Sequence, residues 1–243
     1  MRILITGANG QLGQSFFSWQ KTFPELTLVP STREQMDLGS EESVTSYCKQ
    51  TAFDLLINCA AYTNVDGAES EEEKAKQINV YGPSYLAKEC AEKKVPLIHI
   101  SRDYVYHNQI NRPLLETDPT EPKSIYGRTE LAGEQEIIRQ MDKYLIFRSS
   151  WIIGPHGKNF LKSMIQFMKD RDELKIVSDQ IGAPSSSIDL AHHILSLIKE
   201  GRHATYGIYN LCNSGACSWF DLARFIQCVG GYSCKLSPIP TEE

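Results

Sequence analysis

The sequence predicts an α/β protein, with a Rossmann-type doubly wound parallel sheet over roughly residues 1–150 and a smaller C-terminal lobe over residues 151–243. Two observations lead to this prediction. Short runs that are apolar on both faces alternate with stretches of amphipathic helical spacing, as in βαβ units with a buried parallel sheet. A glycine-rich turn also follows the first of these runs directly and opens a helix. A chain of 243 residues is long enough for one such domain and a small lobe.

The predicted elements follow this alternation along the chain. The β-rich runs predict strands at Arg2–Thr6, Thr27–Ser31, Asp54–Cys59, Pro96–Ser101 and Tyr144–Ser149. Apolar residues at helical spacing predict helices between them, for example Glu41–Thr51 and Tyr85–Lys93. After Trp151 the rhythm loosens, and the predicted order is helix Asn159–Asp172, strand Leu174–Ser178, helix Asp189–Lys199, strand Tyr206–Leu211 and helix Ser218–Val229. We expect these later segments to build mainly the lobe, with some of them returning to the Rossmann domain.

Composition and charge exclude several classes of protein. The formal net charge is −5 and the sequence has no basic arm or stripe, so we expect no nucleic-acid partner. The longest apolar run, residues 55–62, is too short to cross a bilayer, and the N-terminus shows no cleavable signal segment. The seven scattered cysteines are typical of reduced thiols. These features predict a cytoplasmic protein without a membrane partner.

The turn after the first predicted strand is the first candidate site. Gly7, Gly10 and Gly13 recur at every third position between that strand and a helix. Glycines at this spacing permit a tight turn and let a pyrophosphate approach backbone N–H groups at the positive end of the helix. The pattern predicts a dinucleotide-binding turn, and an ordinary glycine turn without a ligand is the alternative.

The end of the second predicted strand bears on the choice of coenzyme. NAD-binding folds of this kind place an acidic residue about 20 residues after the glycine turn, where it binds the adenosine ribose. Here the corresponding segment reads Pro30-Ser31-Thr32-Arg33, and Asp37 comes later. Arg33 is suited to a 2′-phosphate, which favours NADPH slightly over NADH. A solvated surface arginine is the alternative.

Several further segments match one family. They are residues 58–66 (Asn-Cys-Ala-Ala-Tyr-Thr-Asn-Val-Asp), 101–106 (Ser-Arg-Asp-Tyr-Val-Tyr), 126–134 (Tyr-Gly-Arg-Thr-Glu-Leu-Ala-Gly-Glu), 150–154, 157–160 and 179–184. In combination they resemble the dTDP-4-dehydrorhamnose reductase family of the extended short-chain dehydrogenase/reductase superfamily, over essentially the whole chain. Members of that family continue for several tens of residues beyond the segment Pro238–Thr241. We therefore expect a substrate-binding lobe that is truncated at its C-terminus.

The resemblance implies a reductase of nucleotide-sugar biosynthesis. In that reaction NADH or NADPH delivers a hydride to the C4 ketone of dTDP-4-dehydro-L-rhamnose. A tyrosine supplies the proton, giving dTDP-L-rhamnose for cell-surface polysaccharides. Tyr126 is the matching tyrosine, and a phenol can both donate a proton and stabilise a developing alkoxide. A packed core tyrosine is the alternative.

The resemblance also implies binding residues. Val65, Tyr104 and Trp151 are expected at the sugar or the nucleotide. Besides the glycine turn and Arg33, the expected coenzyme contacts are Asn9, Gln11, Leu12, Asp37, Leu38, Ala60, Ala61 and Tyr62. A homodimer is a further expectation. Some relatives bridge a dimer with magnesium through an acidic residue of the first helix, but Ser15 stands at the matching position, so we predict no metal site.

Two positions depart from the family pattern. Arg102 and Glu130 stand where the family has its catalytic Thr and Lys. Glu130 follows Tyr126 by four residues, so both share one helix face, and a carboxylate disfavours the phenolate. At about 5 Å and an effective dielectric of about 20, each unit-charge interaction is worth about 3 kcal/mol. Replacing the attraction between a lysine and the phenolate by the repulsion of Glu130 then costs about 6 kcal/mol, or about four orders of magnitude in rate.

Arg102 offers a compensation for this loss. It follows the predicted strand Pro96–Ser101 and should reach the same pocket, so we hypothesise an Arg102–Glu130 ion pair that nearly neutralises the site. The alternative is that Arg102 blocks the pocket by its bulk. Tyr126, Arg102 and Glu130 are thus the candidate catalytic residues. Besides this reductase, the sequence allows a catalytically impaired, dinucleotide-binding regulatory protein, or a reductase or synthase for another nucleotide ketosugar.

Overall fold

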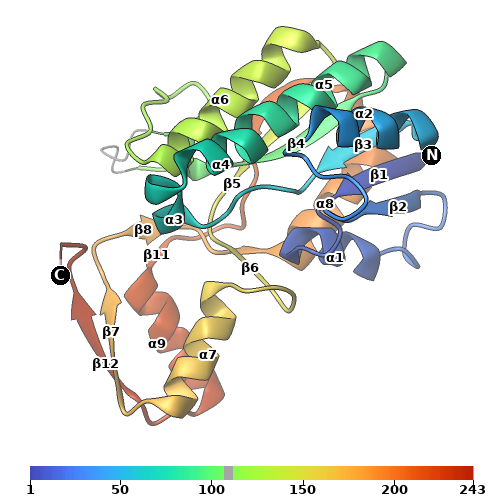
Figure 1. Cartoon of the computed structure of the whole chain (residues 1–243). Coiled ribbons are helices and arrows are strands. Elements are labelled where there is room, and N and C mark those ends of the chain that lie inside the picture. Colours follow the sequence, from blue (N-terminus) through green and yellow to red (C-terminus); the bar gives the residue numbers. More distant parts are fainter. Residues whose placement is uncertain (107–111, 243) are drawn as a thin grey trace.

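A parallel sheet forms the centre of the larger part of the molecule (Figure 1). The computed structural model describes residues 1–106 and 112–242. Within this described part, the sheet has six strands in the order β10-β5-β4-β3-β1-β2. They are β1 (Arg2–Thr6), β2 (Thr27–Ser31), β3 (Leu55–Asn58), β4 (Leu97–Arg102), β5 (Tyr144–Ser149) and β10 (Gly207–Asn210). Every neighbouring pair runs parallel, which confirms the predicted Rossmann-type sheet.

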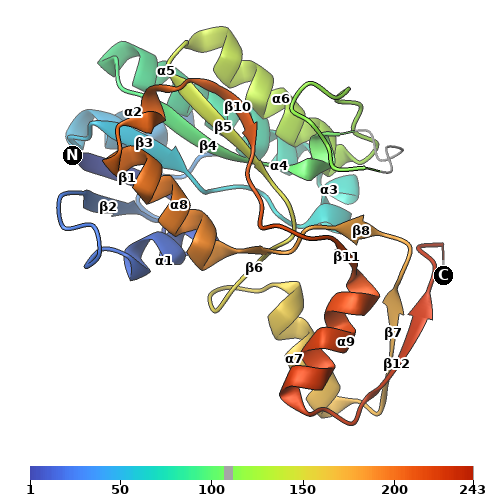
Figure 2. The same ribbon diagram turned by 180° about the vertical axis from the view of Figure 1, so that it is seen from behind.

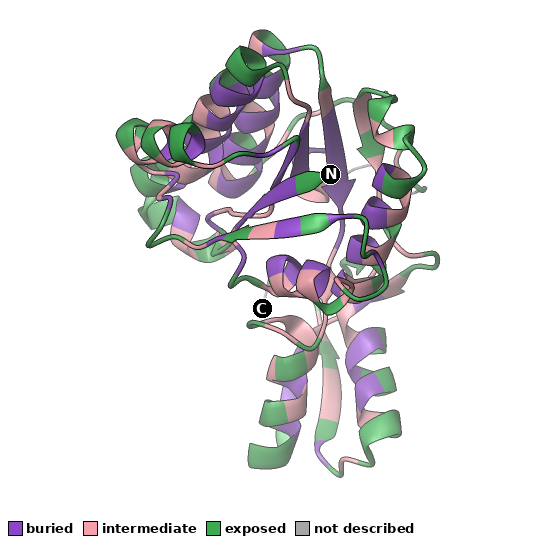
Figure 3. Cartoon of the chain, turned by 90° about the vertical axis from the view of Figure 1, so that its right-hand side faces the viewer, coloured by how far each residue is buried: buried purple, intermediate pink, exposed green. Residues whose placement is uncertain are grey.

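Helices cover both faces of this sheet (Figures 1 and 2). They are α1 (Gln11–Ser18), α2 (Glu41–Gln50), α5 (Gly82–Lys93), α6 (Ile125–Gln140) and α8 (Ser187–Lys199). The shorter α3 (Val65–Ser70) and α4 (Glu72–Lys76) pack with α6. Ile3 and Ile5 of β1 pack with α1 and α8, whereas Leu4 packs with α2, α5 and α6 on the other face. Because helices bury both faces, the strands are apolar at consecutive positions rather than alternate ones. Figure 3 shows these strands as largely buried.

Short helical turns connect several of these elements. A π-helical turn, Gln77–Tyr81, joins α4 to α5, and single 3₁₀ turns are formed by Asp103–Val105 and Arg202–Ala204. Side-chain caps fix where the longer helices begin: Ser124, Asn159 and Ser186 each accept a hydrogen bond from the backbone N–H three residues ahead. The cap at Ser186 explains why α8 begins at Ser187, two residues before its predicted start.

The C-terminal lobe has a core of its own. Its elements are β6 (Ile152–Ile153), α7 (Phe160–Asp170), β7 (Glu173–Val177), β8 (Ile181–Gly182), β9 (Ser185–Ser186), β11 (Cys217–Ser218), α9 (Trp219–Gly230) and β12 (Lys235–Ile239). Met164 of α7 packs with Leu222 and Ile226 of α9 against the parallel β7–β12 pair. The sequence analysis did not predict β12, which contains Pro238, a residue without an N–H. A two-stranded sheet has only edges and tolerates it.

The chain leaves the lobe and returns to the Rossmann domain before it enters the lobe again. α8 packs beside α1, and β10 pairs with β5 at the edge of the main sheet. Residues 187–210 therefore contribute to the sheet domain, although they follow the first half of the lobe in the sequence. Among residues 1–106 and 112–242, no helix is long and apolar enough to span a membrane.

A buried ion pair fastens α6 to the carboxyl ends of β4 and β5. Arg148 Nη2 lies 2.6 Å from Glu134 Oε2, and the two side chains are 4% and 1% exposed. Ser101, the neighbour of Arg148 across the strands, donates its hydroxyl to Glu134 Oε1 at 2.5 Å. The Arg148 guanidinium also lies over the Tyr106 ring, 4.7 Å from its centroid. Removing one partner of such a pair leaves an uncompensated buried charge.

Glu134→Gln is expected to lower the free energy of unfolding by about 3–5 kcal/mol, because Arg148 would stay buried without a counter-charge. Urea unfolding followed by circular dichroism measures this change. The matched control is Glu41→Gln, which removes an exposed pair with Lys88 and should cost at most about 1 kcal/mol. Equal losses in the free energy of unfolding would show that the buried pair stabilises the fold no more than the exposed pair does.

Candidate active site

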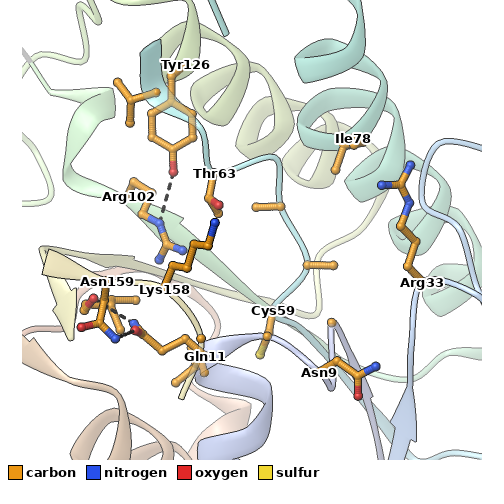
Figure 4. Close-up of a pocket in the computed structure, with 18 of the residues that line it drawn as sticks. Asn9, Gln11, Arg33, Cys59, Thr63, Ile78, Arg102, Tyr126, Lys158 and Asn159 are labelled. Carbon is orange, nitrogen blue, oxygen red and sulfur yellow. Dashed lines mark hydrogen bonds between the residues drawn. The ribbon is translucent and has the colours of Figure 1, made fainter. Parts of the chain in front are cut away.

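A cavity of about 770 Å³ opens at the carboxyl ends of the central strands, between the sheet and the lobe. β1 has β2 on one side and β3 on the other, so the strand order reverses here, and such reversals leave a crevice where ligands bind. The volume falls within the range of small-molecule sites, about 300–1,000 Å³. Figure 4 shows Asn9, Arg33, Thr63, Tyr126 and Lys158 around one open space.

The glycine turn forms one wall of this cavity. Gly7 has φ +62°, in the left-handed region, and a Cβ there would lie 2.9 Å from the backbone N of Ala60. Gly10 caps α1 without a side chain, so the first N–H groups of the helix are open to a ligand. A turn that excludes side chains and presents N–H groups fits the pyrophosphate of a dinucleotide.

Most of the predicted coenzyme residues line the cavity: Gly7, Asn9, Gly10, Gln11, Leu12, Arg33, Asp37, Leu38, Ala60 and Ala61. Gly13 does not. It lies beneath the turn, where a Cβ would collide with the carbonyl oxygen of Gly7. The role of Gly13 is thus close packing of helix and turn. Tyr62 also lies outside the cavity, contrary to expectation, because its buried side chain turns away and donates a hydrogen bond to Glu71 at 2.5 Å.

Arg102 and Tyr126 meet at the far side of the cavity. Arg102 ends β4, Tyr126 lies in the first turn of α6, and both line the cavity. The Arg102 Nε–H donates to the Tyr126 hydroxyl oxygen at 3.2 Å (Figure 4). The Tyr104 ring meets the Tyr126 ring edge to face, with centroids 5.3 Å apart. The phenol is therefore held from two sides, and its own proton stays available for donation.

The hypothesised ion pair between Arg102 and Glu130 is wrong. Arg102 turns to the tyrosine hydroxyl instead, and its Nη1 and Glu130 Oε1 are both buried without a hydrogen-bond partner among the described residues. Glu130, one helical turn after Tyr126 in α6, is 2% exposed and does not line the open space. The charges of the two groups still act on each other, since Arg102 lowers the pKa of Glu130 and Glu130 raises the pKa of Arg102.

Comparison with known proteins agrees with this geometry. Residues 1–243 match the family model described as RmlD substrate binding domain. The chain is 37% identical to the dTDP-4-dehydrorhamnose reductase of Burkholderia thailandensis, over 99% of this chain and 85% of that protein. It is 35% identical to the spore coat polysaccharide biosynthesis protein SpsK of Bacillus subtilis, over 100% of this chain and 84% of that protein.

The chain belongs to the dTDP-4-dehydrorhamnose reductase family. Solved structures of the family share its fold closely. The dTDP-4-dehydrorhamnose reductase of Bacillus anthracis in complex with NADP superimposes with a TM-score of 0.94 at 36% identity, over 99% of this chain and 84% of that one. These relatives support an NADPH-dependent reductase.

Burial is the main influence on the pKa of Tyr126, which stands at the family's tyrosine position. Burial raises the pKa of the Tyr126 phenol above its usual range; Glu130 raises it further, and Arg102 lowers it. Burial also raises the pKa of Glu130 to about 7, against the opposing effects of Arg102 and Tyr126. Near neutral pH the Glu130 carboxyl is therefore partly protonated. Its repulsion of a phenolate is correspondingly smaller than full ionisation implies.

The predicted substrate residues Val65, Tyr104 and Trp151 all line the cavity. Trp151 adopts φ +40°, a backbone conformation that is uncommon outside glycine. Its indole stacks on Trp219 at the start of α9, with ring centroids 3.4 Å apart and planes inclined by 6°. Trp219 also lines the cavity, so a residue of the lobe supports one that follows the main sheet.

The residue-by-residue prediction missed several residues that line the cavity. Lys158 lines it together with Thr63, as Figure 4 shows. Asn159 donates to the Gln11 amide oxygen at 2.5 Å and thereby ties the lobe to the glycine turn. Residues 157–160 belong to a segment that matches the family, which could have drawn attention to Lys158 and Asn159. Trp219 lies in no such motif, and only the fold brings it to the cavity.

Glu130→Gln is expected to change the pH dependence of stability. The pKa of Glu130 in the folded state, about 7, exceeds the ordinary 4.5, so the folded protein binds this proton more tightly. Stability is therefore lost as the pH rises from about 5 to about 8, by about 2–3 kcal/mol. The glutamine variant should lack this loss, as measured by thermal unfolding at both pH values.

The exposed Glu92→Gln is the control, and it should keep the pH trend of the parent. A Glu130→Gln variant whose stability falls with pH as steeply as that of the parent would mean that Glu130 is not the titrating group.

Proposed function

We propose that the chain reduces the C4 ketone of dTDP-4-dehydro-L-rhamnose to dTDP-L-rhamnose with hydride from NADPH, within nucleotide-sugar biosynthesis. The observation that carries this proposal is a single cavity lined both by the dinucleotide-type turn at Gly7 and Gly10 and by the buried Tyr126 phenol. Family members named for this reaction support it. The NADP complex of the Bacillus anthracis relative supports the coenzyme.

Residues of the turn and of the strand ends would hold the coenzyme. NADPH, when bound, supplies the hydride that reduces the ketone carbon. The N–H groups at the start of α1 suit its pyrophosphate. Arg33, whose side chain is 69% exposed, can turn toward a 2′-phosphate, because its contact with Asp37 is long at 3.7 Å. Arg33 would thus favour NADPH over NADH.

Tyr126 would donate the proton to the ketone oxygen as the hydride arrives at the carbon. Its raised pKa keeps the phenol protonated until a stronger base, the developing alkoxide, is present. Arg102 donates to the same phenolic oxygen and stabilises the negative charge left after transfer. We propose that Arg102 in this way replaces part of the function of the lysine that the family pattern has at position 130.

The substrate would lie between the sheet domain and the lobe. Val65, Tyr104 and Trp151 surround the position of the sugar, and the stack of Trp151 on Trp219 offers a flat apolar surface for a ring. Lys158 presents a cation to the same space, which suits the diphosphate of a nucleotide sugar.

A catalytically impaired regulatory protein is the second candidate, and the Glu130 carboxyl one helical turn from Tyr126 favours it. One assay separates the two functions. The chain is mixed with NADPH and dTDP-4-dehydro-L-rhamnose, NADPH absorbance is followed, and the product is identified by chromatography. Coenzyme binding without turnover on a panel of ketosugars would favour the regulatory protein, and turnover of a different ketosugar would overturn the proposed substrate.

Arg33→Ala is expected to raise KM for NADPH by about 10–100-fold, because a charged hydrogen bond to the 2′-phosphate is worth about 1.5–3 kcal/mol. KM for NADH should change by less than about twofold. Initial rates with each coenzyme test this prediction. Arg224→Ala, in the exposed part of α9, is the control, and an equal effect on both coenzymes would exclude phosphate recognition by Arg33.

Tyr126→Phe is expected to lower kcat by about 10²–10⁴-fold, since the ring is retained and the donated proton is lost. KM should change little. The control is Tyr47→Phe, which removes a hydroxyl that donates to Pro30 on the surface and should leave kcat unchanged. A Tyr126→Phe variant with kcat near that of the parent would contradict the role of the phenol.

A further inference from the structure

Tyr126 needs a source of protons, and its surroundings restrict what that source can be. The side chain is 2% exposed and lines the cavity, so NADPH and a substrate in the cavity would separate the phenol from bulk water. Arg102, its hydrogen-bond partner, keeps its protons at any pH at which the protein is folded. Tyr104, which touches the ring from the side, is a phenol whose own pKa is raised, chiefly by burial. Neither neighbour can return a proton to a phenolate.

Glu130 is the remaining titratable neighbour. It follows Tyr126 by one helical turn on the same face of α6, and its charge raises the pKa of the Tyr126 phenol. Its Oε1 is buried without a partner among the described residues. A buried carboxyl oxygen in that state is costly when ionised, and protonation removes its charge.

The groups that act on Glu130 come from two elements. Arg102 faces it from β4, and Tyr126 and Glu134 lie on its own helix. Glu134 is committed to its ion pair with Arg148. On the side of the π-helical turn, Asn79 presents an uncharged amide that donates to Thr129. Burial dominates this balance and raises the pKa of Glu130 to about 7, so the carboxyl exchanges protons near neutral pH.

We propose that Glu130 acts through Tyr126 as the proton source of the reduction, a role that rests on the function proposed above. Hydride transfer to C4 converts the ketone C=O into an alkoxide, which takes the proton from the Tyr126 O–H. The phenolate oxygen then takes the proton of the Glu130 carboxyl, whose O–H bond breaks to leave a carboxylate. After the product leaves, a proton from water in the emptied cavity restores the carboxyl by way of the Tyr126 hydroxyl, which lines the cavity. The sum is ketone, hydride and one proton giving one alcohol.

The charge balance of the site favours this relay. The phenol is a much weaker acid than the carboxyl here, because the pKa of Tyr126 is raised and that of Glu130 is about 7, so transfer to the phenolate runs downhill. Arg102 lies beside both groups and stabilises the negative charge on either. The carboxyl that opposes a phenolate when ionised becomes its proton donor when protonated.

The test compares pH profiles of kcat with dTDP-4-dehydro-L-rhamnose and NADPH for the parent, Glu130→Gln and Glu130→Asp. For the parent, kcat is expected to fall as the pH rises through about 7. Glu130→Gln retains shape but has no transferable proton, so it should lose this limb and at least about tenfold of kcat at low pH, with KM little changed. Glu130→Asp keeps a carboxyl and should keep a limb. Thermal unfolding of each variant checks that it is folded.

Three other outcomes would lead to different conclusions. A folded Glu130→Gln variant with the parent's kcat and pH limb would overturn the relay and leave the proposed function intact. Loss of activity without any change in the shape of the profile would assign Glu130 a structural role and would also overturn the relay. A parent that does not oxidise NADPH with this ketosugar would overturn the proposed function, and the relay with it.

Discussion

The buried ion pair between Glu134 and Arg148 is the contact on which the candidate site depends. It fixes α6 to the ends of β4 and β5, and α6 contributes both Tyr126 and Glu130. Ser101 binds the same carboxylate, and the next residue of β4 is Arg102. Because a buried pair resists separation, the Arg102 guanidinium and the Tyr126 hydroxyl keep their spacing before any ligand enters.

The same burial that strengthens this pair changes the acid–base properties of its neighbours. Charged forms are disfavoured away from water, so Tyr126 and Glu130 both bind protons more tightly than exposed side chains do. The Glu130 carboxyl therefore does not simply add a repulsion against the Tyr126 phenolate. The protonation state decides whether Glu130 opposes or supports the loss of the phenolic proton.

The cavity is completed by both parts of the chain. The sheet provides the glycine turn and the ends of β2, β3 and β4, while the lobe provides Trp219. Asn159 and Gln11 join the two parts directly, and so does the stack of Trp151 on Trp219. A nucleotide sugar that fills the space between them would touch both, so the position of the lobe affects substrate binding without altering the coenzyme turn.

The sequence alone determined the parallel sheet, the glycine turn and the placement of Tyr126 and Glu130 on one helix, because these follow from local patterns of apolar residues, glycine and helical spacing. The family motifs also pointed to Val65, Tyr104 and Trp151, which line the cavity. Tertiary structure decided what depends on side-chain direction and distant partners. Arg102 turns to Tyr126 rather than to Glu130, Tyr62 turns out of the cavity, and β12 forms despite Pro238. The pKa of Glu130 also follows only from the packing around it, since burial is a property of the folded chain.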